Sequence, residues 1–265
     1  MADLLGAGGR EGRPLGPSTV RYVHRIVRKA LHEAVRSNPL FRNPADLAKP
    51  PRANPPGNFK TWNAEELRTF LGACATQRLY AALRLAAMTG MRRGEVLGLR
   101  WRDVEVDQSR LAVVQALILV ENKLTFSQPK TARGRRLVAL DGETIAVLKA
   151  HRARQNAEKL ALGAAYQDGG LVFAKEDGSP VHPGHLTVLF QRLARQAGLP
   201  RIRLHELRHS HATLAFAAGV HPKVVSERLG HASPAFTMQV YSGSVQALHD
   251  EAAKTIAAAV AGRKA

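Results

Sequence analysis

Apolar residues recur at helical spacing along most of this chain. Between Ser18 and Ser37, valine, isoleucine, leucine and alanine return every three or four positions, with arginine and lysine between them. This pattern predicts one amphipathic helix with a basic face. The same spacing predicts helices over residues 64–73, 79–88, 93–99, 141–162, 183–197, 204–218, 221–229, 234–241 and 244–261. We therefore expect a mainly helical protein.

The period changes in the middle of the chain. Residues 110–120, 124–128 and 135–140 are rich in β-branched and other apolar residues, and residues 130–134 have the composition of a turn. These segments predict strands of a small antiparallel sheet, and residues 171–174 predict one further short strand. The expected fold class is mainly α with a small antiparallel β-sheet (α+β).

Two local signals mark helix ends. Asn63 is followed three residues later by Glu66, a spacing that predicts a capping box at the start of the helix over residues 64–73. Gly90 follows the alanine- and leucine-rich run of the next helix, and it is expected to end that helix because glycine tolerates the left-handed conformation of a helix C-terminus.

Glycine and proline divide the chain into parts. Residues 1–16 contain five glycines and a proline without hydrophobic periodicity, which predicts a flexible leader. Several prolines between residues 43 and 58 disfavour both helix and sheet and predict an extended linker. We expect a leader over 1–16, a helical segment over 17–50, a proline-rich linker over 51–59 and a large domain over 60–265.

The charge of the chain points to a polyanionic partner. The 265 residues include 39 lysines and arginines against 21 aspartates and glutamates, a formal net charge of +18. Arginine outnumbers lysine by 28 to 11, which favours phosphate recognition because the guanidinium group is planar and always charged. Both parts are basic: residues 1–57 hold 10 basic and 4 acidic side chains, and residues 58–265 hold 29 and 17.

Other compositional features exclude some protein classes. The single cysteine, Cys74, excludes a disulfide framework and a cysteine-based zinc finger. No run approaches the ~20 apolar residues of a membrane span, and the N-terminus lacks a signal-peptide pattern. We expect a cytoplasmic protein without a membrane partner.

Histidines concentrate in one part of the chain, and seven of the eleven lie between His182 and His231. On a helix, His205 and Arg208 would share one face because they are three residues apart. Residues 205–209 also match the H-E-x-x-H pattern of zinc peptidases, for which Glu227 is the convenient third ligand. Arg208 would then place a fixed cation beside the metal. A helix whose histidines line a polar seam is the structural alternative.

Several sequence boxes occur together in a fixed order. They are Thr89–Glu95, Leu99–Asp103, Pro129–Thr131, His205–His211, Leu229–Ser233 and Tyr241. In order and spacing they resemble the tyrosine recombinases of the phage integrase family, over about residues 61–241. Residues 17–51 more weakly resemble the last helix and exit of that family's core-binding domain. The resemblance implies the tyrosine recombinase catalytic domain fold behind a shortened core-binding domain.

The resemblance assigns roles to individual residues. It identifies Tyr241 as the nucleophile and implies that Glu95 braces the first arginine box. The other catalytic positions that it implies are Arg92, Lys130, His205, Arg208 and His231. Of the remaining tyrosines, Tyr22 and Tyr80 lie in apolar helical stripes and are expected in the core, and Tyr166 lies in a loop.

The implied activity is site-specific recombination. Family members cleave and rejoin DNA through a 3′-phosphotyrosyl intermediate, so neither ATP, a metal nor another cofactor is expected. The implied partners are double-stranded DNA, other protomers of a homotetramer that assembles through the C-terminal helix 244–261, and an accessory directionality factor; the expected location is the nucleoid. Because only about one core-binding helix is recognisable, a DNA-binding remnant that does not recombine DNA is the alternative, and a zinc peptidase is the third.

Overall fold

The computed structural model describes residues 2–52, 60–128 and 135–230, and it divides the chain into two compact units, Met1–Asn58 and Phe59–Ala265. The predicted helices over 234–241 and 244–261, the turn over 130–134 and most of the linker over 51–59 lie outside the described residues.

The N-terminal unit is built on one long helix. Helix α2 (Pro17–Arg36) begins with a proline in its first turn, where the missing N–H costs nothing, and it agrees with the predicted helix. No element was predicted over residues 1–16, but the structure has helix α1 (Ala2–Ala7) and a 3-10 turn (Arg10–Gly12) there. Alanine and leucine favour the helix locally, and the Leu15 amide donates to the Leu4 carbonyl at 3.0 Å.

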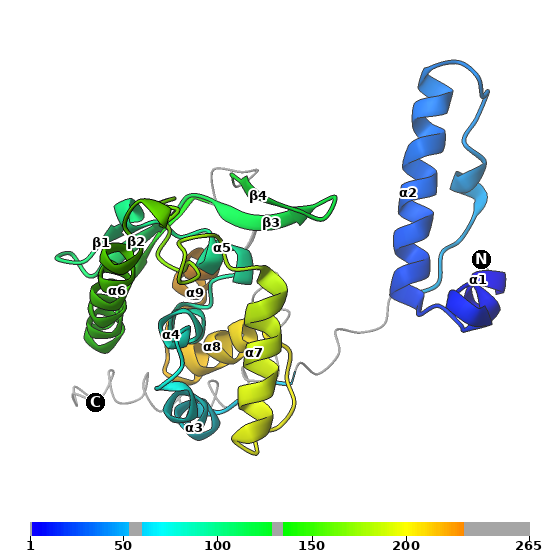
Figure 1. Cartoon of the computed structure of the whole chain (residues 1–265). Helices are drawn as coiled ribbons and strands as arrows, with labels where there is room; N and C mark the ends of the chain where they lie inside the picture. Colours follow the sequence, from blue (N-terminus) through cyan, green and yellow to red (C-terminus); the bar gives the residue numbers. More distant parts are fainter. Residues whose placement is uncertain (1, 53–59, 129–134, 231–265) are drawn as a thin grey trace, which may run out of the picture. The chain divides into compact units, whose positions relative to one another are not determined.

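The segment after α2 returns along it (Figure 1), and polar side-chain contacts join the two. Within the stretch that was predicted to be extended, Asn43 caps a 3-10 turn (Pro44–Leu47), because its side chain supplies the acceptor that a helix start needs. The Asn43 Nδ2 donates to the Arg28 carbonyl at 2.9 Å, and the Arg28 Nε donates to Asp46 at 2.5 Å. Tyr22, predicted in the core, is 59% exposed because no described element covers its side of α2.

The second unit contains most of the helices. They are α3 (Ala64–Cys74), α4 (Tyr80–Thr89), α5 (Arg93–Leu97), α6 (Gly142–Leu162), α7 (Pro183–Gln196), α8 (Glu206–Ala217) and α9 (Pro222–Leu229), with 3-10 turns at Trp101–Asp103 and Gly163–Ala165. Both predicted helix ends are confirmed: Asn63 and Glu66 form a reciprocal capping box, and Gly90 ends α4 at φ 64°. None of the described helices is long and apolar enough to cross a membrane.

The strands form two small antiparallel sheets in place of the predicted one. Strands β1 (Val104–Glu105), β2 (Arg110–Val113) and β5 (Arg136–Ala139) make one, and β3 (Ala116–Val120) and β4 (Lys123–Ser127) make a separate hairpin. The predicted strand over 110–120 is therefore broken. Gln115 at the break donates to the Gly98 carbonyl at 2.8 Å, and β3 then packs on α5, where Gly94 and Gly98 leave room for its backbone.

The predicted strand over residues 171–174 is also wrong, since only isolated bridges occur at its ends. Two side chains of α6 take carbonyls that a neighbouring strand would otherwise use: His151 Nε2 lies 2.7 Å from the Val172 oxygen, and Gln155 donates to the Leu171 oxygen at 3.0 Å. The segment is thus buried against a helix, which explains its apolar sequence without a sheet.

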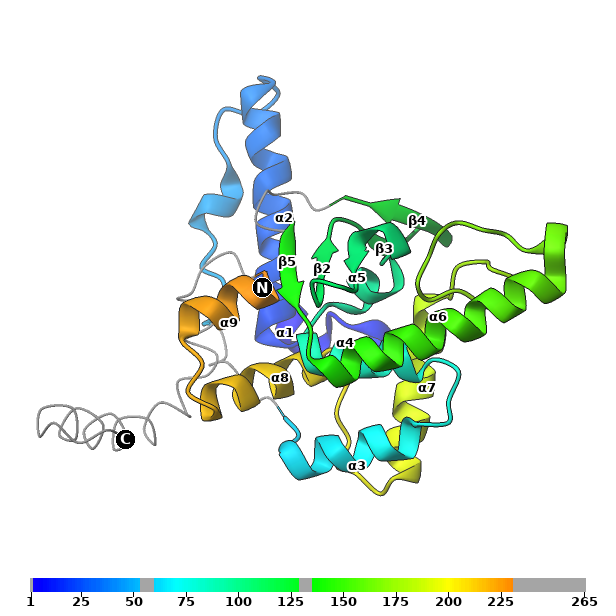
Figure 2. The same cartoon turned by 90° about the vertical axis from the view of Figure 1, so that its left-hand side faces the viewer.

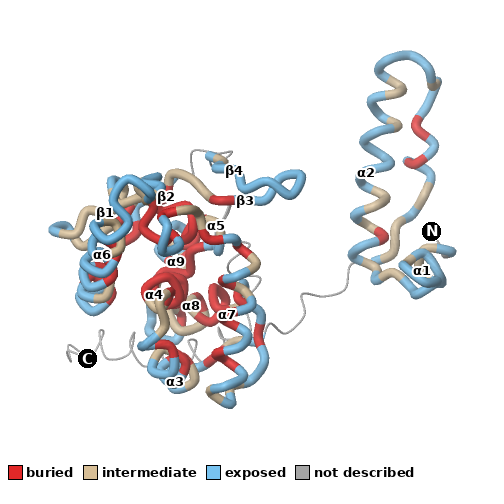
Figure 3. The backbone as a smooth tube through the Cα atoms, viewed as in Figure 1, coloured by how far each residue is buried: buried red, intermediate tan, exposed pale blue. Residues whose placement is uncertain are grey.

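Helix α4 runs through the centre of the second unit and packs against α8, α6 and α3 (Figures 1 and 2). Nearly all of its residues are buried (Figure 3). Trp62, Phe70 and Phe190 pack beside it with ring centroids 5.0–5.4 Å apart. The main core holds α4 and the N-terminal end of α8, and a separate cluster of Ala212, Phe216, Val225 and Leu229 joins the rest of α8 to α9.

Candidate active site

Arg208 lies at the point where two chain turns meet. It projects from α8, is only 4% exposed, and donates from Nη1 to the Gly90 carbonyl and from Nη2 to the Leu229 carbonyl, both at 2.7 Å. Gly90 ends α4 immediately before the box that contains Arg92, and Leu229 ends α9 shortly before His231. One guanidinium group therefore joins two segments that are far apart in sequence.

The turn at Gly90 requires glycine for two reasons. Its φ of 64° lies in the left-handed region, and a Cβ there would stand 2.4 Å from Cδ2 of Leu229 and 3.0 Å from Cδ2 of His211. A side chain would therefore displace the buried side chain of Leu229 as well as strain the backbone. The Thr-Gly-Met sequence before Arg92 thus reflects a packing requirement of the site.

Arg92 lies at the N-terminus of α5 and remains 45% exposed. Its Nη1 donates to Glu95 Oε1 and its backbone N–H to Glu95 Oε2, each at 2.8 Å. Its Nη2 lies 3.4 Å from the Gly230 carbonyl. The structure therefore places the Glu95 carboxylate directly against Arg92.

Glu95 has a second cationic partner that the sequence analysis missed. Arg136 of β5 donates to Glu95 Oε1 at 3.2 Å and to Oε2 at 2.8 Å, and both side chains are buried. Burial alone would raise the pKa of Glu95, but the hydrogen bonds and charges of Arg136 and Arg92 outweigh it and lower that pKa. The alternation along β5 gave a signal: Arg136 shares its face with buried Val138.

His205 precedes the first turn of α8 and faces the same region as the two arginines. Partial burial lowers the pKa of His205, and the charges of Arg208, Arg92 and Arg203 lower that pKa further. Its ring meets that of buried His209 edge to face, with centroids 5.5 Å apart. A lowered pKa keeps the imidazole neutral near pH 7, which is the form that can accept a proton.

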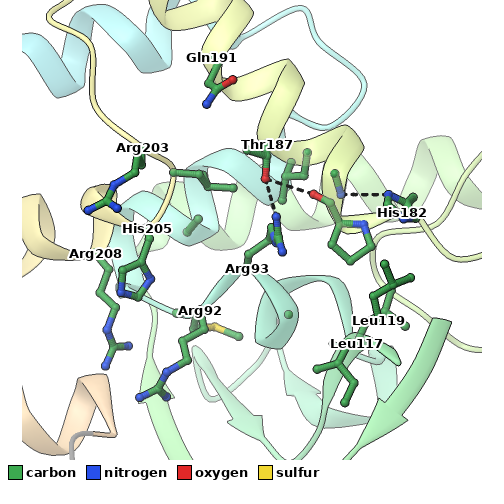
Figure 4. A pocket seen from close by; sticks show the side chains of 18 residues that line it. Arg92, Arg93, Leu117, Leu119, His182, Thr187, Gln191, Arg203, His205 and Arg208 are labelled. Carbon is green, nitrogen blue, oxygen red and sulfur yellow. Dashed lines mark hydrogen bonds between the residues drawn. The ribbon is translucent and has the colours of Figure 1, made fainter. Parts of the chain in front are cut away.

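Arg92, His205 and Arg208 border a cavity of about 730 Å³. Figure 4 shows Arg92, His205 and Arg208 gathered on one side of it, with Arg93 and His182 on the other. Arg93 donates to Thr187 of α7 at 2.7 Å, and β3 contributes an apolar wall. The cavity therefore offers a strongly cationic edge beside an apolar surface.

The zinc-peptidase alternative conflicts with the position of Glu206. Its carboxylate accepts hydrogen bonds from the backbone N, Nε and Nη2 of Arg203, at 2.5–3.1 Å, so it is turned away from the role of a general base. Among residues 2–52, 60–128 and 135–230, no three His, Cys, Asp or Glu side chains are grouped to hold a metal ion. The arrangement of these described side chains, rather than their chemistry, does not fit a zinc site.

Three residues predicted for the site, Lys130, His231 and Tyr241, lie outside the described residues. The described chain stops at Gln128 and resumes at Arg135 on either side of Lys130, and it ends at Gly230, next to His231. The structure thus brings Arg92, Glu95, His205 and Arg208 together, and the positions of the other three remain predictions.

Known proteins share both the sequence and the fold. The model of the phage integrase family matches residues 60–247. A tyrosine recombinase XerC-like protein of Caldanaerobacter subterraneus subsp. tengcongensis is 30% identical over 90% of this chain and 65% of its own length. The ICEBs1 integrase of Bacillus subtilis is 26% identical over 86% of this chain and 62% of its own length. The chain thus spans just under two thirds of these relatives.

Solved structures agree on the architecture. The Tn1549 transposon integrase in complex with a circular intermediate DNA aligns with a TM-score of 0.71 at 20% identity, over 89% of this chain and 80% of that chain. A XerA recombinase aligns with a TM-score of 0.59 at 20% identity, over 89% and 82%. The predicted fold class, mainly α with small antiparallel sheets, is confirmed as that of the tyrosine recombinase catalytic domain. By its family match and its sequence relatives, this chain belongs to the phage integrase family.

Proposed function

We propose that this protein is a site-specific recombinase that cleaves and rejoins DNA strands through a 3′-phosphotyrosyl intermediate, without ATP or a metal. The convergence of Arg92, Arg208 and His205 on one cavity carries the proposal. Three of the family's boxes meet there because Arg208 of one box is hydrogen-bonded to the Gly90 and Leu229 carbonyls of two others. The scissile phosphate would lie at this cationic edge.

The two arginines would stabilise the transition state of phosphoryl transfer. Attack on a DNA phosphodiester adds negative charge to its non-bridging oxygens, and fixed donors aimed at that charge are worth most where water is excluded. Guanidinium groups suit this role because they stay protonated and offer paired N–H donors. His231 would supply a third donor.

The covalent step needs a nucleophile, a base and an acid. The Tyr241 oxygen attacks phosphorus, the bond from phosphorus to the 5′ oxygen breaks, and a 3′-phosphotyrosyl bond forms. His205 takes the tyrosine proton and Lys130 gives a proton to the leaving 5′ oxygen. Attack by a 5′ hydroxyl then reverses these changes and rejoins the strand, so the bond energy is conserved.

DNA binding would draw on the charge of the whole chain. The net charge of +18 supplies contacts to phosphates that do not depend on sequence, and release of counterions makes such affinity fall steeply with salt. The basic face of α2 in the N-terminal unit would add to this term. Such a protein would be associated with the nucleoid.

Assembly would couple cleavage to other protomers. Residues 244–261 carry an apolar stripe at helical spacing, and we propose that this helix docks on a neighbouring protomer within a homotetramer on DNA. A groove of about 450 Å³, lined by Leu67, Leu71, Met88 and Leu214 of α3, α4 and α8, offers an apolar surface of suitable kind. An accessory directionality factor completes the proposed set of partners.

Deletion of residues 244–265 tests this assembly. Strand exchange and protomer association on DNA should weaken while the domain stays folded, as measured by electrophoretic mobility and circular dichroism. Unaltered assembly by the shortened protein would overturn the proposed role of the helix.

Trapping of the covalent intermediate tests the activity. We expect the protein to form an adduct with nicked suicide duplexes of random sequence that survives a denaturing gel and forms equally in chelator. Tyr241→Phe should abolish the adduct, and Tyr166→Phe, the same change in a loop, should not. Adduct formation by Tyr241→Phe would overturn the nucleophile assignment.

The same assay distinguishes the alternatives. Salt-sensitive DNA retention without any adduct would favour a DNA-binding remnant, and stoichiometric zinc with peptide cleavage would favour a peptidase.

If the proposal holds, Arg208→Lys should slow adduct formation by about 100-fold or more, since loss of a single transition-state donor has that effect. The rate should also fall as acid protonates His205, below the ordinary histidine pKa of 6.5.

A further inference from the structure

Arg136 lies where three segments of the catalytic domain meet. It belongs to β5, its Nη1 and Nη2 donate to Glu95 of α5, and its Nε donates to the Arg228 carbonyl at the end of α9 at 2.7 Å. The side chain is 7% exposed, so its donors are directed at protein groups. It therefore links β5 with α5, which begins beside Arg92, and with the end of α9.

Glu95 is a buried carboxylate that depends on two cations. Oε1 accepts from Nη1 of Arg92 and Nη1 of Arg136, and Oε2 accepts from the Arg92 backbone and Nη2 of Arg136. A charge removed from water is tolerated only when it is paired and hydrogen-bonded. The bidentate contact of Arg136 supplies half of these hydrogen bonds.

This sharing leaves Arg92 able to act on another anion. Arg92 is 45% exposed and gives Glu95 one side-chain hydrogen bond, because Arg136 provides the other cation. Without Arg136, Arg92 would be the only cation that the described part of the chain places beside this buried carboxylate. Its guanidinium group would then be drawn toward Glu95 and away from a phosphate in the cavity.

Arg136 also lies close to the turn at the end of α9. Gly230 has a φ of 67°, and a Cβ there would stand 2.9 Å from Nη1 of Arg136. The Gly230 carbonyl in turn lies 3.4 Å from Nη2 of Arg92. Arg136 thus occupies the space into which a side chain at Gly230 would extend.

We propose that Arg136 is a positioning residue for DNA cleavage: it neutralises Glu95 so that Arg92 is available to the scissile phosphate, and it holds the end of α9 through the Arg228 carbonyl. This role rests on the proposed recombinase function. Arg136 itself touches no DNA, and it acts through Glu95 and the Arg228 carbonyl.

Kinetics of suicide-substrate cleavage test the role. Arg136→Met should slow adduct formation at saturating DNA by about 100-fold, the effect of misplacing a catalytic group, and change the half-saturating DNA concentration by less than about 3-fold. Arg136→Lys keeps the charge, but its single nitrogen cannot donate to both oxygens of Glu95 and to the Arg228 carbonyl as the guanidinium group does. An intermediate loss of the cleavage rate is therefore expected. Arg110→Met on neighbouring β2, whose partner is Glu105, is the matched control and should cleave normally.

Removal of the buried charge provides the decisive comparison. In the double variant Glu95→Gln with Arg136→Met, no carboxylate remains to capture Arg92, so cleavage should be faster than with Arg136→Met alone. Unfolding by urea should show the same coupling, with the two substitutions costing less together than the sum of their separate effects.

The outcomes separate this inference from the function on which it rests. A wild-type protein that forms no adduct would count against the recombinase function, and the unfolding cycle would still report on the coupling of Arg136 with Glu95. A folded Arg136→Met protein that cleaves at the wild-type rate overturns the positioning role. A double variant no faster than Arg136→Met, or strictly additive unfolding effects, overturns the role of Glu95 in it. If Arg136→Met does not fold, cleavage by Arg136→Lys and by the double variant decides: wild-type rates for Arg136→Lys overturn the role, and a slowed Arg136→Lys supports it.

Discussion

The two units of this chain are each stabilised by a different kind of internal contact. Among the described residues of Met1–Asn58, only Val20, Asn43 and Ala45 are buried, while large apolar side chains such as Tyr22 and Phe41 are exposed. In the described part of Phe59–Ala265, a continuous core of aliphatic and aromatic side chains surrounds α4. The first unit relies on polar contacts between α2 and the returning segment, and the second relies on packing.

This difference explains where a precise site can be built. Charged side chains hold a fixed geometry only when packing locks the elements that carry them. Arg208 and Glu95 are buried at the ends of elements of the packed core, whereas the charges of α2 are exposed on a helix with little around it. In the proposed function, the first unit would bind phosphates generally, and the second would position groups around one phosphate.

The largest expected effect is on the core of the second unit. Phe70→Ala should lower the free energy of unfolding by about 3–5 kcal/mol, because it leaves a cavity beside Trp62 and Phe190. Urea unfolding followed by tryptophan fluorescence reports this unit alone, since both tryptophans, Trp62 and Trp101, lie in it. Val20→Ala should move this transition by less than about 0.5 kcal/mol. An equal shift by both variants would mean that the units unfold as one.

A smaller effect is expected at the turn that holds Arg208. Gly90→Ala should cost about 2–3 kcal/mol, because a Cβ meets Leu229 and the backbone is left-handed. Gly219→Ala, with φ of 74° and open space around it, isolates the backbone effect and should cost about 1 kcal/mol. Gly12→Ala, equally open in the first unit, should leave the tryptophan transition unchanged. Equal losses for Gly90 and Gly219 would show that the turn packing is unimportant.

Acid should destabilise the second unit through its buried histidines. Burial lowers the pKa of His209 and of His211 to about 4, aided by neighbouring cations. The folded state therefore resists protonation that the unfolded state accepts below about 6.5, so stability present above that pH is lost as the pH falls toward 4. Each histidine should cost about 2 kcal/mol between pH 7 and pH 5. In urea unfolding at both values, His209→Asn should reduce this pH dependence; an unchanged dependence would exclude His209 as a contributor.

The smallest effect is expected on the polar contacts of the first unit. The ion pair of Arg28 with Asp46 is largely exposed, and such pairs contribute less than about 1 kcal/mol. Arg28→Ala should slightly reduce the ellipticity at 222 nm at low salt, and the difference should vanish at high salt. Arg36→Ala on the same helix, whose 3.4 Å contact with Glu33 is weaker, is the control. A large loss of helix on Arg28→Ala would show that polar contacts dominate this unit.

Helices and their ends were predictable because their signals are local. The apolar spacing that predicted a helix over 141–162 and the Asn63–Glu66 box both depend on residues within a few turns of each other. Strands depend on partners elsewhere in the chain, so the run over 110–120 was predicted as one strand although its halves belong to two sheets. Helix α1 was not predicted, because the glycines of residues 1–16 interrupt a short run of helix-forming residues.

The candidate site shows the same division. The sequence boxes identified Arg92, Glu95, His205 and Arg208 individually, because a family's spacing is visible in one sequence. That Arg208 bridges the Gly90 and Leu229 carbonyls, and that Arg136 pairs with Glu95, could not be read from the boxes. These contacts join residues that are brought together by the packing of α8 on α4 and of α9 on β5.

The sequence by itself therefore determined the family and most of the described helices, and it predicted the reactive groups, since each of these depends on short-range patterns and charge. Only the tertiary structure decided how the cations are shared between a buried carboxylate and an open cavity. The physical reason is that a hydrogen bond or an ion pair depends on distance in space and on burial, and both are set by the packed core.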